Sequence, residues 1–224
     1  LLAPLVVGII GVVVERLVIR WLYGRMVDTL LATWGLSLLF IGLVTSIFGA
    51  STTTTISPPL GVVEIGQYSS SGYELFLIGV AAVVLLVVYM LLKMTRLGLV
   101  ARGTMQNDEM AAALGVSTSR IYMLSFGIGA AVSGLAGGLM APLTGVLPTI
   151  GATYIAKAFI KVISGGAAIL AGTASASVLL GGINGVFAFL TGPTLGEVAL
   201  LLTAIVLLRL MPRGITGSFF RKSL

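Results

Sequence analysis

The sequence predicts an all-α fold, a polytopic bundle of transmembrane helices, and two observations carry this prediction. First, charged residues make up only 9% of the 224 residues and hydrophobic residues 58%, whereas a soluble domain carries roughly 25% charged residues. The mean hydropathy is +1.15. Second, long apolar runs recur between charges, prolines and glycines, and about 20 apolar residues suffice for a helix to cross the hydrocarbon core of a bilayer.

Apolar runs of spanning length predict about six full crossings. They are residues 30–48, 75–92, 121–140, 154–170, 173–190 and 193–211. Asp28 and Thr29 are suitable N-terminal caps for the first of these, and Pro193 suits the first turn of the last. The opening run, residues 1–14, rises only about 21 Å. We therefore expect it to be the end of a helix that starts upstream, and residues 1–224 to form a single transmembrane domain that is incomplete at its N-terminus.

Two connecting segments differ from the spans in composition. The segment ERLVIRWLYGRMVD predicts an interfacial amphipathic helix over residues 15–28. One face of this helix carries Arg16, Arg20, Gly24 and Asp28, and the opposite face carries Leu17, Val18, Trp21 and Leu22. Residues 50–72 are polar and rich in Ser and Thr, and they include Pro58 and Pro59. This segment is expected to be the one sizeable external loop.

The basic residues predict the orientation of the bundle. When the crossings are counted along the chain, all but two of the thirteen basic residues fall on one face: Arg16, Arg20, Arg25, Lys93, Arg96, Arg102, Arg120, Arg209, Arg213, Arg221 and Lys222. The opposite face carries Glu64, Glu74 and Glu197 and no basic residue. Because positive charge is retained on the cytoplasmic side, the basic face is predicted to be cytoplasmic.

Small residues repeat at four-residue intervals in two of the spans, as is typical of helices that approach closely in lipid. The repeats are Ser125, Gly129, Ser133 and Gly137, the adjacent Ala130, Gly134 and Gly138, and Thr173, Ser177, Gly181 and Gly185. We interpret these stripes as packing faces rather than as solute contacts.

The cytoplasmic loop of residues 93–120 contains a short helix candidate. Asn107 or Asp108 is a suitable cap, and the acidic Asp108 and Glu109 complement the positive end of a helix. Gly115 is expected to end it. A helix of this length is unstable alone, and it carries small and apolar residues into water. It therefore either folds back on the membrane helices or docks into another protein, and the residues by themselves leave both open.

The segment MQNDEMAAALGVSTSRI resembles the cytoplasmic coupling loop of the LIV-type permeases, the membrane subunits of branched-chain amino acid and urea or short-amide ABC importers. TGVLPTIGATYIAKAF, KVISGGAAILAG and LRLMPRGITG agree with this family in order and spacing. Glu109, Ala111 and Gly115 keep part of the wider importer pattern EAAxxxG. The chain departs from the family in two ways. It has the sequence GGAA at residues 165–168 in place of a GG-x-GS-like turn, and the opening spans of the family are missing.

The resemblance implies a coupling loop that rests in a groove of a cytoplasmic ABC ATPase. The residues assigned to this loop are Asn107, Asp108, Glu109, Ala111, Ala112 and Gly115. The other implied partners are a second permease subunit, identical or related, a periplasmic or surface solute-binding protein, and membrane lipid, but no nucleic acid. The resemblance places the complex in a bacterial or archaeal cytoplasmic membrane.

The same resemblance implies a small polar or amphipathic solute, a branched-chain amino acid before urea or a short amide. No cofactor is expected on this chain, and ATP is expected on the partner, because no G-x-x-x-x-G-K-[ST] phosphate-binding loop occurs. A stand-alone channel or secondary carrier is the alternative function. A membrane-embedded enzyme is the least favoured, since the chain has no His and no Cys to provide a metal site or the commonest general base.

Lys157 and Lys161 interrupt the run of residues 154–170 one helical turn apart. A charge at the bilayer centre costs about 2.5–3.5 kcal/mol on insertion scales, so it usually faces a cavity or a partner. Lys157, Gly165 and Gly166 are therefore the candidate lining of a solute path, where a broken helix exposes backbone groups. For Lys157 the alternative is that its long stem carries the charge to an interface, and for Lys161 this alternative is favoured.

Overall fold

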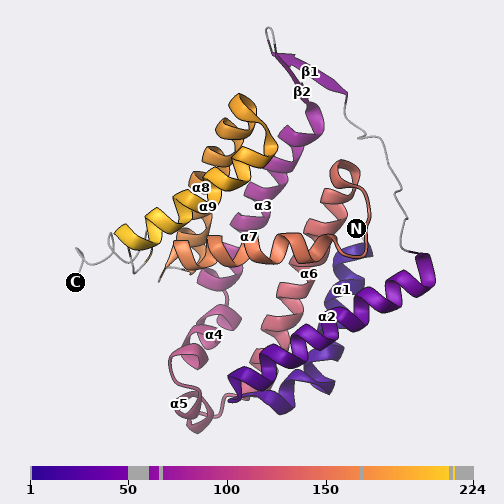
Figure 1. The fold of residues 1–224 in the computed structure, drawn as a ribbon. Helices are drawn as coiled ribbons and strands as arrows, with labels where there is room; N and C mark the ends of the chain where they lie inside the picture. The colour runs from indigo at the N-terminus through magenta and orange to yellow at the C-terminus, as the bar shows by residue number, and fades with distance from the viewer. Residues whose placement is uncertain (1, 50–60, 66–67, 167–168, 212–213, 215–224) are drawn as a thin grey trace. The chain divides into compact units, whose positions relative to one another are not determined.

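The computed structural model describes residues 2–49, 61–65, 68–166, 169–211 and 214. Its elements in chain order (Figure 1) are α1 (Leu2–Leu17), the 3₁₀ helix η1 (Ile19–Leu22), α2 (Met26–Phe48), β1 (Val62–Ile65), β2 (Tyr68–Ser71), α3 (Gly72–Met94), α4 (Arg96–Gln106), α5 (Asp108–Ala113), α6 (Thr118–Thr144), α7 (Ile150–Gly165), α8 (Ile169–Thr191) and α9 (Pro193–Leu210). They fall into two compact units, Leu1–Pro148 and Thr149–Leu224.

The predicted fold class, an all-α polytopic bundle, is confirmed. Five helices in the described part of the chain are long and apolar enough to cross a membrane: Val27–Phe48, Gly72–Met94, Thr118–Thr144, Leu170–Thr191 and Pro193–Leu210. Among the described elements, β1 and β2 are not helical. They form an antiparallel pair in which Val62 lies opposite Ser71. This pair falls in the segment predicted to be an external loop. The β-branched residues Val62, Val63 and Ile65 favour a strand there.

The predicted crossing at residues 154–170 is wrong in its extent. α7 has 16 residues, which rise about 24 Å, short of the roughly 30 Å hydrocarbon core. The helix ends because Gly166 adopts a φ of +79°, a conformation that glycine reaches without a steric penalty. The described chain therefore has five helices of spanning length where the sequence predicted about six.

The predicted amphipathic helix over residues 15–28 is also wrong, because it is not continuous. α1 ends at Leu17, η1 follows, and α2 starts only at Met26. Gly24, between η1 and α2, has a φ of +87° and turns the chain. The two faces that the sequence pattern defined therefore do not belong to one helix.

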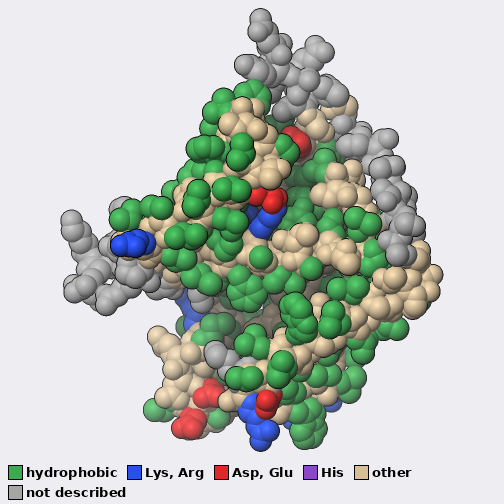
Figure 2. Space-filling model, viewed as in Figure 1, with side chains coloured by type: hydrophobic (Ala, Val, Ile, Leu, Met, Phe, Trp, Pro, Cys, Tyr) green, Lys and Arg blue, Asp and Glu red, His purple; other side chains and the backbone are tan. Residues whose placement is uncertain are grey.

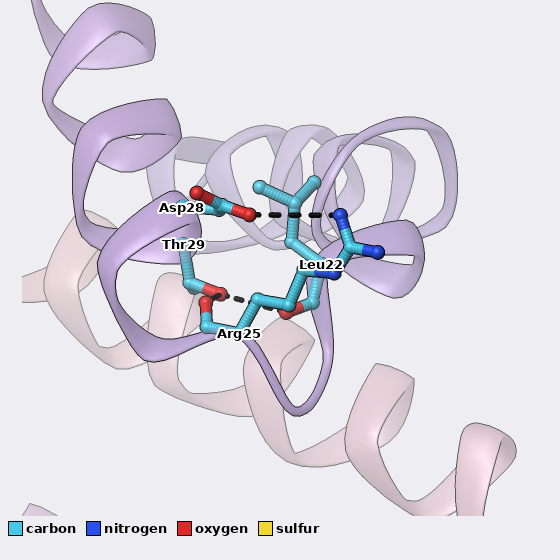
Figure 3. A network of polar contacts seen from close by, with 4 residues as sticks. All are labelled: Leu22, Arg25, Asp28 and Thr29. Carbon is cyan, nitrogen blue, oxygen red and sulfur yellow. Dashed lines mark hydrogen bonds and ion pairs between the residues drawn. The ribbon is translucent and has the colours of Figure 1, made fainter.

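Figure 3 shows how the chain enters α2. The hydroxyl of Thr29 donates to the carbonyl oxygens of Arg25 at 2.8 Å and Leu22 at 3.0 Å. A guanidinium nitrogen of Arg25 lies 3.8 Å from a carboxylate oxygen of Asp28. Asp28 and Thr29 thus lie inside the first turn of α2 and are not its caps, which corrects the sequence prediction. Thr29 instead ties the end of η1 to the start of α2.

In the first unit, α1 and α6 pack antiparallel through small residues. A Cβ placed on Gly134 would lie 2.7 Å from the Cβ of Val7, and one on Gly127 would lie 2.5 Å from a methyl group of Val12. Such close approach lets helices associate in lipid by van der Waals packing. The predicted stripe that contains Gly134 is therefore confirmed as a packing face. The parallel stripe is not, since no described atom would contact a Cβ on Gly129 within 4 Å.

In the second unit, α8 packs against both α7 and α9. Ala176 and Leu180 of α8 are fully buried, and Leu200 and Ala204 of α9 are 3% exposed. Ile160 of α7 packs against this core. The stripe predicted on α8 is displaced by one position, because a Cβ on its members Gly181 and Gly185 would meet no described atom within 4 Å.

Large apolar side chains cover the outside of each unit. In α2 and α3 none of the residues in the spanning windows is buried, and Figure 2 shows hydrophobic side chains over much of the visible face. Such a surface is stable in lipid and unfavourable in water.

Some predictions concern residues outside the described ranges: Pro58, Pro59, Ala167, Ala168, Arg213, Arg221 and Lys222.

Candidate functional site

The short helix predicted in the loop of residues 93–120 is present as α5. The side-chain oxygen of Asn107 accepts a hydrogen bond from the backbone N–H of Met110 at 2.9 Å, so Asn107 is the cap and Asp108 the first helical residue. Asp108 and Glu109 occupy the first turn, where the partial positive charge of the helix favours carboxylates. The start of the helix is confirmed.

The end of α5 is confirmed as well. Gly115 adopts a φ of +85°, and its N–H donates to the carbonyl of Ala112 at 2.9 Å. The N–H of Val116 donates to the carbonyl of Ala111 at 3.1 Å. These two bonds satisfy carbonyl groups that the end of a helix leaves without partners.

α5 is in part folded back and in part exposed. It contacts α4 and α6, and Ala111 is 8% exposed. Met110 and Leu114, however, are 60% and 79% exposed, and their four-residue spacing places them on the same side. Ala112 is exposed too. The outward side of α5 therefore combines apolar side chains with the acidic residues of its first turn.

The sequence reasoning missed α4, the helix that positions α5. The side chain of Thr95 accepts a hydrogen bond from the N–H of Gly98 at 3.2 Å and so caps α4. A Cβ on Gly98 would run into the backbone of Leu92, so glycine allows the tight turn from α3 into α4. Thr95 three residues before Gly98 was the signal available in the sequence.

In the second unit, the ammonium nitrogen of Lys157 lies 2.5 Å from a carboxylate oxygen of Glu197. The side chain of Lys157 is 34% exposed and that of Glu197 57%. Glu197 was predicted to be an external-interface residue, and its pairing with Lys157 was missed. Lys157 follows the first residue of the predicted run 154–170 by three residues, and Glu197 follows the first residue of the run 193–211 by four, which was the available signal that their depths match.

The structure does not bring Gly165 and Gly166 together with Lys157. Gly165 follows Lys157 by eight positions in the helix, about 12 Å along the axis. Gly165 is buried, and a Cβ on it would lie 2.6 Å from the backbone of Gly172 in α8. Gly214 packs directly on Gly166. Neighbouring backbone thus occupies the space at this helix break, whereas the side chain of Lys157, away from the break, is 34% exposed.

Ser164, next to the helix break, was not singled out from the sequence. Its residue is 0% exposed, and its hydroxyl oxygen has no hydrogen-bond partner among the described atoms. A buried hydroxyl without a partner costs about 1–3 kcal/mol. Nothing in the local pattern distinguishes this serine, because its burial depends on the packing of α7 against α8.

The exposed side of α5 can associate with a partner surface, and Lys157 and Glu197 can pair with charged groups. Within the described residues, no group of three or more His, Cys, Asp or Glu side chains could hold a metal ion. α5 offers an exposed apolar and acidic surface, whereas Lys157 and Glu197 offer one positive and one negative group side by side.

Where the comparisons with known proteins find a match, it is to branched-chain amino acid transport permeases. A family model described as "Branched-chain amino acid transport system / permease component" matches residues 1–211. A relative from Methanocaldococcus jannaschii, named "Probable branched-chain amino acid transport permease protein LivH", is 28% identical over 166 residues, which cover 70% of this chain and 53% of the relative.

The Escherichia coli and Salmonella typhimurium proteins named "High-affinity branched-chain amino acid transport system permease protein LivH" are each 31% identical over 127 residues. The matches cover 56% of this chain and 41% of each relative. The chain thus spans about half the length of the curated relatives that it matches. No solved structure gives a significant match.

Proposed function

The chain belongs to the family of permease components of branched-chain amino acid transport systems, and we propose that it is a membrane-spanning subunit of an ABC importer. In this proposal it carries a branched-chain amino acid inward across the cytoplasmic membrane by alternating access. Two permease subunits, two cytoplasmic ATPase subunits and a solute-binding protein make up the complex. ATP is bound by the ATPase subunits, since this chain has no phosphate-binding loop sequence.

The observation that supports ATPase coupling best is the construction of α5. A six-residue helix needs external stabilisation, and here a cap at Asn107 and a stop at Gly115 fix both ends. Met110 and Leu114 nevertheless remain exposed to a large extent. A helix that is held in shape while it keeps its largest apolar side chains outward is suited to insert into a groove of a partner.

The proposed solute class is supported by Lys157 and Glu197. An amino acid carries an ammonium and a carboxylate group, and these two side chains provide the opposite charges at adjacent positions. Both are attached to apolar helices, where isolated charges are costly. Urea, which is neutral, has no need for such a pair. In this proposal the solute separates the two side chains and pairs with each of them.

Cross-linking tests the coupling assignment. The chain has no native cysteine, so an Ala112→Cys variant places a unique thiol of this chain on the exposed side of α5. We expect it to cross-link to a cysteine introduced in the groove of a co-expressed ATPase. Glu74→Cys, at the opposite end of α3 and exposed, is the control that must not react. If Ala112→Cys fails to cross-link in a complex that still imports solute, coupling through α5 is refuted.

Uptake by reconstituted vesicles tests the solute. We expect ATP-dependent uptake of radiolabelled leucine and valine but not of urea. Lys157→Gln and Glu197→Gln should each raise the KM for leucine, whereas Lys161→Gln, one turn away on α7, should leave it unchanged. Urea as the transported compound would refute the amino acid assignment. Leucine uptake that persists without any ATPase subunit and collapses with the membrane potential would instead identify a secondary carrier.

A further inference from the structure

A cavity of about 450 Å³ lies at one end of the first unit, where α1, η1 and α6 meet. Its lining includes Arg16 from the last turn of α1, Arg20 from η1 and Arg120 from the first turn of α6. The antiparallel packing of α1 on α6 brings the last of these beside the other two, about a hundred residues along the chain. We call this space the arginine cavity.

The arginine cavity has an excess of positive charge. Among the described residues, none of its three guanidinium groups lies within 4.0 Å of a carboxylate oxygen. One acidic residue, Glu15, also lines the cavity, but it is 1% exposed and accepts a hydrogen bond from the hydroxyl of Tyr23 at 3.0 Å. The lining of the cavity thus carries three guanidinium groups and one carboxylate, and that carboxylate is hydrogen-bonded to Tyr23.

The third wall of the cavity is the start of α6. Ser117 and Ser119 line it, and the side chain of Ser117 caps no backbone N–H of the helix. The first N–H groups of a helix have no partner within it, and together they carry a partial positive charge. Hydroxyl groups, first-turn amides and guanidinium groups around one space form a favourable environment for phosphate oxygens, which arginine binds in bidentate geometry.

We propose that the arginine cavity binds the phosphate group of an anionic phospholipid. Each arginine of the α1–η1 segment is followed directly by an exposed apolar residue, Leu17 at 69% and Trp21 at 81% exposure. Arginine and tryptophan side by side are typical of the membrane–water interface, and basic pockets between membrane helices bind phospholipid headgroups. A free phosphate ion would gain nothing from Leu17 and Trp21, whereas the acyl chains of a lipid pack against them. The bound headgroup bridges α1 and η1 to α6.

Thermal unfolding of the full chain in phosphatidylcholine nanodiscs tests the proposal. Short-chain phosphatidylglycerol is titrated in one arm, short-chain phosphatidylcholine in a second and inorganic phosphate in a third. We expect phosphatidylglycerol alone to raise the unfolding temperature at low concentration. Replacing all three arginines by glutamine should raise its half-saturating concentration on the order of a hundredfold, since each basic residue near an anionic lipid contributes roughly fivefold.

Single variants provide the matched comparison. Arg120→Gln should weaken the response to phosphatidylglycerol, whereas Arg96→Gln, which removes an exposed arginine at the start of α4 outside the cavity, should not. An equal effect of the two variants overturns the proposal. So does an equal response to phosphatidylglycerol and phosphatidylcholine. Stabilisation by inorganic phosphate to the same extent as by phosphatidylglycerol overturns the lipid as the source of the phosphate.

A second measurement needs no variant of the cavity. The chain has two tryptophans, and a Trp34→Phe variant leaves Trp21 as the only one, next to Arg20. In vesicles that contain a small fraction of brominated lipid, we expect brominated phosphatidylglycerol to quench Trp21 fluorescence more strongly than brominated phosphatidylcholine. Equal quenching by the two lipids contradicts a selective headgroup site at the arginine cavity, whether or not the triple variant folds.

Discussion

Lys157 of α7 and Glu197 of α9 form an ion pair with 2.5 Å between the ammonium nitrogen and a carboxylate oxygen. The two residues are separated by the whole of α8 in the chain. Each lies in a largely apolar segment, where an unpaired charge at the bilayer centre costs about 2.5 kcal/mol or more on insertion scales. Pairing offsets part of this cost and links two helices that otherwise contact mainly α8.

The first prediction concerns this link. Lys157→Gln and Glu197→Gln should each destabilise the chain, because each leaves the partner's charge unpaired. The double variant should be less destabilised than the sum of the two, with a coupling on the order of 1 kcal/mol, as in exposed or half-exposed ion pairs. Thermal unfolding of the four proteins in lipid nanodiscs measures the coupling. Strictly additive effects would show that the pair contributes nothing to stability.

The membrane bundle was predictable because lipid imposes its requirement on the sequence of every span. Runs such as that of α3 are apolar over their whole length, so their position and length follow from composition. The extent of α7 was not predictable in this way. Its residues continue in apolar sequence past Gly166, and the helix stops there through a left-handed backbone conformation that glycine permits but does not require.

In the candidate sites, too, features set by neighbouring residues were predictable and features set by distant residues were not. The cap and the stop of α5 depend on residues within one or two turns of each other, so the sequence alone narrowed the cap to Asn107 or Asp108 and indicated Gly115 as the stop. The partner of Lys157 lies forty residues away, and its identification requires the relative depth of α7 and α9. Burial of Gly165 likewise depends on α8, and no local pattern encodes it.

A second prediction concerns the cap of α5. Asn107→Ala removes the side-chain acceptor for the N–H of Met110, a loss that costs about 1 kcal/mol of helix stability. Hydrogen exchange of the amides in α5 should therefore become about fivefold faster. Asn107→Asp keeps an acceptor at the same position and should exchange as slowly as the original protein. If the Ala and Asp variants exchange at the same rate, the cap does not stabilise α5.

A third prediction compares Gly134 and Gly137, two glycines of α6 that are three residues apart. At Gly134 an added Cβ would lie 2.7 Å from the Cβ of Val7, whereas at Gly137 it would meet no described atom within 4 Å. Gly134→Val should separate α1 from α6 and destabilise the chain by about 1–3 kcal/mol, as overpacking does. Gly137→Val should cost much less. Circular dichroism melting curves in the same lipid distinguish the two, and equal melting temperatures would contradict the packing described for α1 and α6.

The last relationship lies beside the arginine cavity. The hydroxyl of Tyr23 donates to a carboxylate oxygen of Glu15 at 3.0 Å, and its ring centre lies 4.7 Å from that of Tyr122. Burial, followed by the hydrogen bond and the negative charge of Glu15, raises the pKa of Tyr23 above its ordinary value near 10. The neutral phenol is thus favoured in the folded protein.

The fourth prediction follows from the raised pKa of Tyr23. A raised folded-state pKa stabilises the protein fully below the unfolded pKa near 10, and the stabilisation is lost as pH rises above that value. Tyr23→Phe should therefore lower stability at pH 8 by about 1–3 kcal/mol, because Glu15 loses its donor. The difference from the original protein should shrink above pH 10. Tyr122→Phe, which keeps a ring at the stacking position, is the control. A Tyr23→Phe deficit that does not change between pH 8 and pH 11 would show that the phenol proton does not hold Glu15.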